Sequence, residues 1–301
     1  MKFLLIFIVT LFVLYFTVGI ILYAFQRKFI YYPTPVAEHS YQEIAINVDT
    51  NINIKTIRIN PGKRNAVIYF GGNADSVVNH ADSLSYTLPD TTIYLVNYRG
   101  YGGSDGFPTE DHLFNDAEVI FEAVKKEHER VSVIGRSLGS GVAVWLASKH
   151  PVHRMVLITP FDSALNIAKS AYPIYPIGWM LKDKFLSDEY AREVFIPVQI
   201  LLADHDLVFP LNFSKNLIRN FSVKPSVHMF DNTDHNNVHQ HKNFYHAIRS
   251  FLEPEDTLYG NSPVNLPPVT PLQQSRELIS ARNTQKSVSY THLTLPTICS
   301  V

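Results

Sequence analysis

Residues 131–141 constrain this chain more than any other stretch: an apolar, β-branched run ends in a Gly-Arg-Ser-Leu-Gly turn, and helical apolar spacing follows. A serine at such a strand-to-helix turn is held in a strained backbone conformation that exposes its hydroxyl. Gly135 and Gly139 lack a Cβ atom, so the strand and the helix can pack closely around the turn. The pattern predicts that Ser137 is a nucleophile and that the N–H of Leu138 forms half of an oxyanion hole. The alternative is an ordinary turn with a hydrogen-bonded serine.

Strand and helix signals alternate through the middle of the chain. The segments 43–48 and 52–59 alternate apolar and polar residues, which is typical of half-buried antiparallel strands. Buried strands are then predicted at 66–70, 92–96, 131–134, 155–158, 198–202 and 226–230, and helices near 75–86, 111–127, 138–149, 209–220 and 237–252. Antiparallel strands followed by parallel βα units predict an α/β protein with a mostly parallel central sheet.

Composition excludes several classes of protein. The chain has 301 residues, of which 46% are hydrophobic, and this is enough for one domain with a sizeable core. Its net charge of −1 lacks the basic surplus of a nucleic-acid-binding protein, so no nucleic acid partner is expected. The sequence contains a single cysteine, Cys299, so neither an intrachain disulfide nor a cysteine-based zinc site is possible.

Residues 3–25 carry no charge and are predicted to form one transmembrane helix. At about 1.5 Å per residue, such a helix crosses the roughly 30 Å hydrocarbon core of a bilayer. The alternative is a cleaved signal peptide, with an apolar core of about 7–15 residues and a small-residue cleavage site. The longer run favours a retained signal anchor and a single-pass membrane protein. Lys2 and the amino terminus before the span are balanced by Arg27 and Lys28 after it, so positive charge does not decide the orientation.

The sequence changes character after Leu252. Residues 254–286 are rich in proline and polar residues, which predicts a flexible tail. Residues 287–301 resemble translated sequencing-adapter read-through and are interpreted as non-native; the alternative is a genuine short tail. Between the anchor and this tail, residues 26–253 are predicted to form one catalytic domain.

An aromatic and apolar segment, residues 171–187, interrupts the strand–helix alternation. It is too short to be a domain of its own, and we interpret it as a short cap. Such a cap can cover an acyl pocket or dip into the membrane. The alternative is a plain packed helix.

A serine nucleophile needs a base, and the base needs an acid that orients it. In a fold of this kind they follow in the order serine, acid, histidine, on loops after successive strands. His235 follows the last predicted strand and is the predicted base. Asp206, after the strand at 198–202, is preferred as the acid over Asp204 in the same loop. Asp162 is the alternative acid, although it could instead cap the helix that follows it.

The loop after the strand at 66–70 begins Gly-Gly-Asn and is predicted to supply the second oxyanion donor, the N–H of Asn73. A phosphate-binding loop is the alternative, but the glycine spacing matches neither common motif. His235, His239 and His241 raise the possibility of zinc, which the missing His-Glu-x-x-His pattern disfavours. No metal and no organic cofactor is predicted.

Together these motifs resemble the membrane-anchored branch of the α/β-hydrolase superfamily, which includes fungal bud-emergence-type proteins and eukaryotic depalmitoylating hydrolases. The resemblance runs from Phe25 to about Leu252, and its motifs are Phe-Gly-Gly-Asn-Ala at 70–74, Asn-Tyr-Arg-Gly-Tyr-Gly-Gly-Ser-Asp-Gly-Phe-Pro-Thr-Glu at 97–110, Gly-Arg-Ser-Leu-Gly-Ser-Gly at 135–141, Thr-Pro-Phe-Asp-Ser at 159–163, Asp-Leu-Val-Phe-Pro at 206–210 and His-Asn at 235–236.

The resemblance implies an α/β-hydrolase fold and a triad of Ser137, Asp206 and His235. It also implies that the loop at 98–108 shapes the floor of the active site. The chain departs from the family pattern at two positions, because Gly71 stands where relatives usually have histidine and Asn97 where they usually have aspartate.

The expected function is hydrolysis of carboxylic esters or thioesters by a membrane-anchored serine hydrolase. The partners would be a small ester or acyl substrate, which includes acyl lipids and lipidated proteins, and the membrane itself. One alternative is a serine peptidase, which is disfavoured because no propeller-like gating domain is present. The other is a non-catalytic, membrane-anchored interaction module, which would not require the three triad residue types on three loops.

Overall fold

A computed structural model describes residues 1–253 of the chain. The predictions for 254–286 and 287–301, and Cys299 with them, lie outside the described residues.

One eight-stranded sheet organises the domain, in the order β1-β2-β4-β3-β5-β6-β7-β8. The strands are β1 Gln42–Asp49, β2 Ile52–Ile59, β3 Asn65–Phe70, β4 Thr91–Val96, β5 Arg130–Arg136, β6 Met155–Ile158, β7 Val198–Ala203 and β8 Ser226–Phe230. The pairs β1–β2 and β2–β4 are antiparallel, and all other neighbours are parallel. The predicted α/β-hydrolase layout, with antiparallel strands first, is therefore confirmed.

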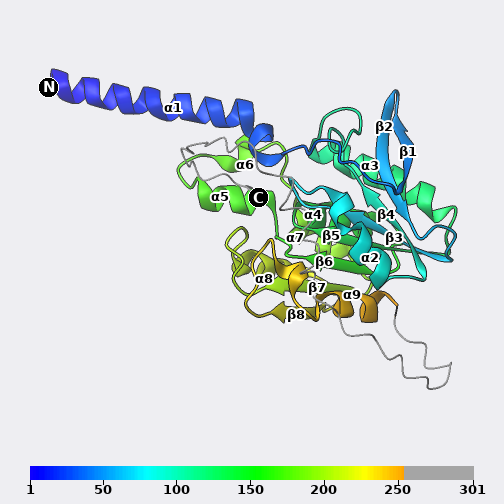
Figure 1. The fold of residues 1–301 in the computed structure, drawn as a ribbon. Coiled ribbons are helices and arrows are strands. Elements are labelled where there is room, and N and C mark those ends of the chain that lie inside the picture. Colours follow the sequence, from blue (N-terminus) through cyan, green and yellow to red (C-terminus); the bar gives the residue numbers. More distant parts are fainter. Residues whose placement is uncertain (254–301) are drawn as a thin grey trace, which may run out of the picture. The chain divides into compact units, whose positions relative to one another are not determined.

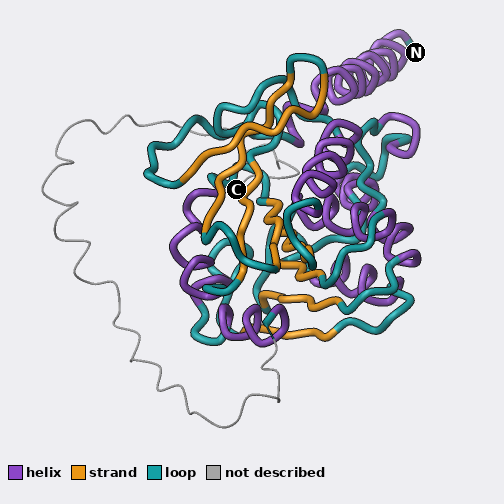
Figure 2. The backbone as a smooth tube through the Cα atoms, turned by 90° about the vertical axis from the view of Figure 1, so that its right-hand side faces the viewer, coloured by secondary structure: helices purple, strands orange, loops and turns teal. Residues whose placement is uncertain are grey.

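Helices cover both faces of the sheet (Figures 1 and 2). The helices of the described residues are α1 Lys2–Ile30, which projects away from the sheet, α2 Ala81–Thr87, α3 Glu110–Lys125, α4 Leu138–Lys149, α5 Ala164–Ala171, α6 Ile177–Met180, α7 Ser187–Tyr190, α8 Leu211–Asn220 and α9 Phe244–Leu252, with 3₁₀ turns η1 Val77–His80, η2 Ala191–Glu193 and η3 Val238–Gln240.

Successive side chains of β3 point to opposite faces of the sheet and pack into two separate hydrophobic cores. Ile68 and Phe70 join the core under α3, α4 and α8, whereas Val67 and Tyr69 join the core under α2 and α9. All four side chains are at most 2% exposed. Because both faces are covered, the strand carries an unbroken apolar run.

Two details differ from the sequence predictions. Strand β8 was predicted to be buried, but it is the last strand of the sheet and four of its five residues are exposed. The single helix predicted at 237–252 is instead η3 followed by α9. His241 has an extended backbone, with φ −65° and ψ 133°, and its Nδ1 accepts from the N–H of Asn243 at 3.2 Å, so the chain leaves the helical path between η3 and α9.

The apolar N-terminal helix α1 contains 29 residues and extends beyond the predicted span of 3–25. It is long and apolar enough to cross a membrane, and an 18-residue stretch of it has a mean hydropathy of 2.8. Its last turns are part of the folded domain, because Gln26 and Ile30 are buried. In Figure 1 this end of α1 lies beside α5 and α6.

The segment predicted to be a cap contains α6 and reaches the start of α7. It is not one continuous helix. Pro173 and Pro176 separate α5 from α6, because proline cannot continue the hydrogen bonding of a helix interior.

Candidate active site

Ser137 occupies the turn between β5 and α4 in a strained conformation, with φ 50° and ψ −116°. Its N–H donates to the carbonyl of Ile158 at 3.0 Å, which ties the turn to β6. A Cβ atom at Gly139 would lie 2.1 Å from the carbonyl oxygen of Phe70, and one at Gly135 would lie 2.5 Å from the oxygen of Gly139. The turn therefore requires both glycines.

The structure brings the three predicted triad residues together. The Ser137 Oγ lies 2.9 Å from the His235 Nε2, and the His235 Nδ1 lies 2.8 Å from the Asp206 Oδ2. A carboxylate only accepts hydrogen bonds, so the imidazole proton resides on Nδ1 and Nε2 accepts from the serine hydroxyl. His235 is 2% exposed.

Backbone groups hold the other oxygen of Asp206. The N–H groups of Val208 and Phe209 donate to Oδ1 at 3.0 and 2.8 Å. The ring of Phe209 stands edge-on to the His235 imidazole, with centroids 5.1 Å apart. The carboxylate and the imidazole are therefore fixed in orientation and shielded from water.

The other two candidate acids have different partners. Asp204 accepts from the N–H groups of Asn232 and Thr233, each at 3.0 Å, and so shapes the loop that carries the histidine. The carboxylate of Asp162 bonds the N–H of Ser163 and the amides of Asn166 and Asn216. Ser163 caps α5.

The loop after β3 lies against the serine. A Cβ atom at Gly72 would be 3.4 Å from the Cβ of Ser137. The side-chain oxygen of the next residue, Asn73, accepts from the backbone N–H of Tyr32 at 2.9 Å and from the hydroxyl of Tyr101 at 2.8 Å. On the other side Leu138 is the first residue of α4, where backbone N–H groups lack helical acceptors.

The loop at 98–108 contacts the same region. Its Tyr98 hydroxyl donates to the carbonyl of Gly71 at 2.9 Å, and its Tyr101 bonds to Asn73. A Cβ atom at Gly71 would lie 2.8 Å from Val77, so in this chain the position has no room for a larger side chain unless the loop shifts.

A buried ionic cluster beneath the site was missed at the sequence level. Asp75 accepts from the N–H of Gly72 at 3.2 Å and pairs with Arg136 at 3.2 Å and with His80 at 2.9 Å. Arg136 also reaches the carbonyl of His235 at 3.4 Å. The cluster thus links the predicted oxyanion loop to the histidine loop. No motif signals it, because its members are joined only by the fold.

Opposing effects act on the pKa of Asp75. Burial raises it, but the hydrogen bond and charge of His80, the Arg136 guanidinium and the Gly72 N–H together hold the pKa well below its usual range. Asp75 is therefore ionised in spite of its burial, and these partners stabilise the buried negative charge.

The three histidines considered as zinc ligands have different partners and do not converge on one point. His235 bonds to Ser137 and Asp206, His241 pairs with Asp231 at 3.6 Å, and His239 packs edge-on against His80. Within residues 1–253, no group of three or more side chains is arranged to hold a metal ion.

Comparisons with known proteins agree with this architecture. A family model described as alpha/beta hydrolase fold matches residues 65–173. Protein bem46 of Schizosaccharomyces pombe is 24% identical over 271 residues, which cover 78% of this chain and 88% of that protein. The lysophosphatidylserine lipase ABHD12 of Danio rerio is 30% identical over 174 residues, which cover 50% of this chain but only 46% of the lipase.

Among solved structures, the esterase Pf2001 of Pyrococcus furiosus superposes with a TM-score of 0.57 at 16% sequence identity. The match covers 73% of this chain and 93% of the esterase. At this identity the likeness shows a shared fold.

Proposed function

Because the chain belongs to the α/β-hydrolase superfamily, we propose that it is a membrane-anchored serine hydrolase that cleaves carboxylic esters or thioesters. The hydrogen-bonded series from Ser137 through His235 to Asp206 carries this proposal. A fold alone does not specify a reaction, whereas a buried nucleophile, base and orienting acid have one well-understood use.

In the first half of the reaction, the Ser137 Oγ attacks the acyl carbon and its proton passes to the His235 Nε2. Asp206 keeps the other imidazole nitrogen protonated and stabilises the imidazolium. The N–H groups of Leu138 and Asn73 hold the oxyanion of the tetrahedral intermediate. His235 then gives its proton to the departing alcohol or thiol, and an acyl-serine remains.

In the second half, His235 takes a proton from water, and the resulting hydroxide attacks the acyl carbon of the acyl-serine. The second tetrahedral intermediate uses the same two N–H donors. Its collapse returns the proton to the Ser137 Oγ and releases a carboxylic acid. Every proton in this cycle moves through one imidazole, so the reaction needs no cofactor.

Acyl lipids or lipidated proteins are the proposed substrates. An anchored domain meets such molecules at the membrane surface, and the similar Danio rerio protein is named a lysophosphatidylserine lipase. In nanodiscs, kcat/KM for esters and thioesters should rise with acyl length from about two to sixteen carbons, and Ser137→Ala should abolish it. A preference for short, water-soluble esters would contradict the proposed substrate class.

The proposed anchor is α1, retained in the mature protein. Its support is that α1 packs on the domain before residue 25 as well, because Gly19 is buried and Tyr15 stacks on Tyr175; cleavage near residue 25 would remove these contacts. The protein should stay in the membrane pellet after alkaline carbonate extraction, and its N-terminal peptide should include residues before Phe25. A soluble product beginning near residue 25 would show a signal peptide instead.

A further inference from the structure

The C-terminal half of α1 is paired with the cap. The rings of Tyr15 and Tyr175 stack, with centroids 4.7 Å apart and planes 12° apart. The hydroxyl of Tyr15 donates to the carbonyl of Ile174 at 2.9 Å, and the hydroxyl of Tyr175 donates to the carbonyl of Tyr15 at 3.1 Å. Gly19, one turn further along α1, leaves space for the Tyr175 ring. The cap therefore follows α1 well into its uncharged stretch.

In both α1 and the cap the sequence changes from uncharged to charged, and the two changes lie next to each other in the structure. Helix α1 acquires its first charges after the span at Arg27, and the cap becomes charged at Lys182, after an uncharged run from Ser170 to Leu181. Arg27 and Asp183 form a two-pronged ion pair at 2.9 and 3.1 Å. A shared boundary of this kind is what a membrane surface imposes on two elements that enter it together.

The amide of Gln26 joins α1 and the cap at the same boundary. Its nitrogen donates to the carbonyl of Met180 at 3.0 Å, and its oxygen accepts from the N–H of Lys182 at 2.7 Å. The ammonium of Lys182 lies 4.7 Å above the ring of Tyr23. Aromatic rings and basic side chains are typical of the interface between hydrocarbon and headgroups.

The outward face of the cap is apolar. Trp179 is 93% exposed and Ile174 is 69% exposed. Water penalises such exposure, whereas hydrocarbon does not.

Several backbone N–H groups of the cap are already paired, which lowers the cost of placing this segment in hydrocarbon. Tyr172, Tyr175, Ile177 and Trp179 donate their N–H groups to carbonyls within the segment or in α5. The prolines at positions 173 and 176 have no N–H to satisfy.

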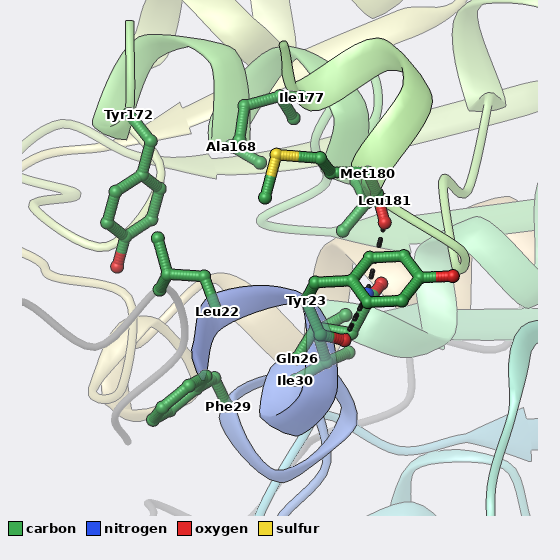
Figure 3. A pocket seen from close by; sticks show the side chains of 10 residues that line it. All are labelled: Leu22, Tyr23, Gln26, Phe29, Ile30, Ala168, Tyr172, Ile177, Met180 and Leu181. Atoms are coloured by element: carbon green, nitrogen blue, oxygen red, sulfur yellow. Dashed lines mark hydrogen bonds between the residues drawn. The ribbon is translucent and has the colours of Figure 1, made fainter. Parts of the chain in front are cut away.

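A groove runs between α1 and the cap (Figure 3). It is lined by Leu22 and Phe29 of α1, by Tyr172 after α5, and by other apolar residues of α5, α6 and the residue that follows α6. Gln26 is the one amide in the lining, and both ends of that amide are already hydrogen-bonded. The apolar surface that begins at Trp179 thus continues inward between the two elements.

We propose that the cap segment Tyr172–Leu181 is itself inserted into the bilayer, in the leaflet crossed by the C-terminal half of α1. Its partner is the hydrocarbon of the lipid chains. Tyr15 precedes Arg27 by twelve residues, so at about 1.5 Å per residue the tip of the cap reaches about 18 Å along α1 from the charged boundary. The inference rests on the proposed anchoring by α1, and it places the domain with its cap pressed into the membrane.

Tryptophan fluorescence tests this insertion, because Trp145 and Trp179 are the two tryptophans of the chain. In full-length Trp145→Phe protein in phosphatidylcholine vesicles, Trp179 should lose at least half of its emission when the acyl chains are brominated. Aqueous iodide should quench it little. As the matched control, Trp179→Phe leaves Trp145, which stacks on Phe114 at 4.6 Å, and bromination should not change its emission.

A second probe makes the result independent of one substitution. With both native tryptophans changed to phenylalanine, Ile174→Trp places a reporter at another exposed cap position, and it should also be quenched by brominated chains. Strong iodide quenching of both reporters, with no effect of bromination, would overturn the proposal. Carbonate extraction of the same samples reports on anchoring, and an active-site label reports on Ser137. Failure of insertion is therefore distinguishable from failure of the proposed function.

Discussion

Two regions of the molecule are stabilised by different interactions. One is the carboxyl end of the sheet, where Ser137 lies, and the other is the surface that α1 forms with the cap. At the carboxyl end of the sheet, the triad and the Asp75–Arg136 pair are joined by short polar contacts, and the strained backbone of Ser137 is held by a hydrogen bond to β6. On the α1–cap surface, an ion pair, a stacked ring pair and a few hydrogen bonds join elements whose outer apolar side chains stay uncovered. The first arrangement holds the reacting groups in one geometry, which bond-making requires. The second offers a surface, which suits contact with lipid.

Removal of the nucleophile or of the base should have the largest effect, and it tests whether the carboxyl end of the sheet is the catalytic region. Ser137→Ala and His235→Ala should each lower kcat by about 10⁴-fold or more, because both act in the same proton transfer. The fold should survive, since neither side chain is part of the apolar core. Circular dichroism and kcat measurements on detergent-purified protein check both expectations. A variant that keeps more than a tenth of the activity would exclude that residue from the mechanism.

The ionic cluster beneath the site should matter for both stability and rate. Asp75→Asn leaves the buried Arg136 without its anionic partner, and breaking such a pair costs about 3–5 kcal/mol. The Gly72 N–H loses a charged acceptor, so kcat should also fall, by about tenfold. Urea unfolding and kcat measure the two effects. Asp90→Asn, at a largely exposed residue, is the matched control and should leave both unchanged.

Where α3 meets the end of the cap, a carboxyl group makes stability depend on pH. Burial raises the pKa of Glu110 to about 7, although the N–H groups of Lys184 and Phe185 oppose the shift. The folded protein therefore binds this proton more tightly than the unfolded chain, whose carboxyl titrates near 4.5. The contribution is complete below pH 4.5 and is lost as the pH rises through 7.

Comparison with Glu110→Gln isolates this contribution, because the amide does not titrate. The stability of the wild type relative to the variant should decrease between pH 5 and pH 8, as measured by urea unfolding. The exposed Glu127→Gln variant should show no such trend. A pH-independent difference for Glu110→Gln would contradict the pKa assignment.

The smallest effect is expected at the cap. Tyr175→Phe keeps the ring that stacks on Tyr15 and loses only one hydrogen bond to a helix carbonyl. Unfolding free energy should fall by about 1 kcal/mol or less, with hydrolysis of short esters unchanged. Thermal unfolding in detergent and an ester assay check this. A large loss of activity would mean that the cap positions catalytic atoms, and the contrast between the two surfaces would fail.

Local patterns predicted most of the architecture. The Gly-x-Ser-x-Gly turn, the period-two strands and the βα alternation depend on neighbours in the chain, and the fold and the family resemblance drawn from them are confirmed. The chain order of Ser137, Asp206 and His235 followed from the loops after successive strands, and these residues lie within hydrogen-bonding distance. Their catalytic roles stay predictions.

Features that depend on distant contacts were not predictable. The pairing of Asp75 with Arg136 joins residues 61 positions apart. The pairing of α1 with the cap joins residues about 160 positions apart. The exposure of β8 follows from its place at the end of the sheet, which its own apolar residues do not encode. Sequence periodicity reports which face of an element is apolar, but not what covers that face.

The most direct test of the central claim is covalent labelling of the serine. Membranes containing the full-length protein are treated with a fluorophosphonate probe, and the adduct is mapped by mass spectrometry beside Ser137→Ala and His235→Ala. The account predicts one adduct, on Ser137, that is absent from both variants. Folded protein that takes no label, or takes it on another residue, would contradict the assignment of Ser137 as an activated nucleophile.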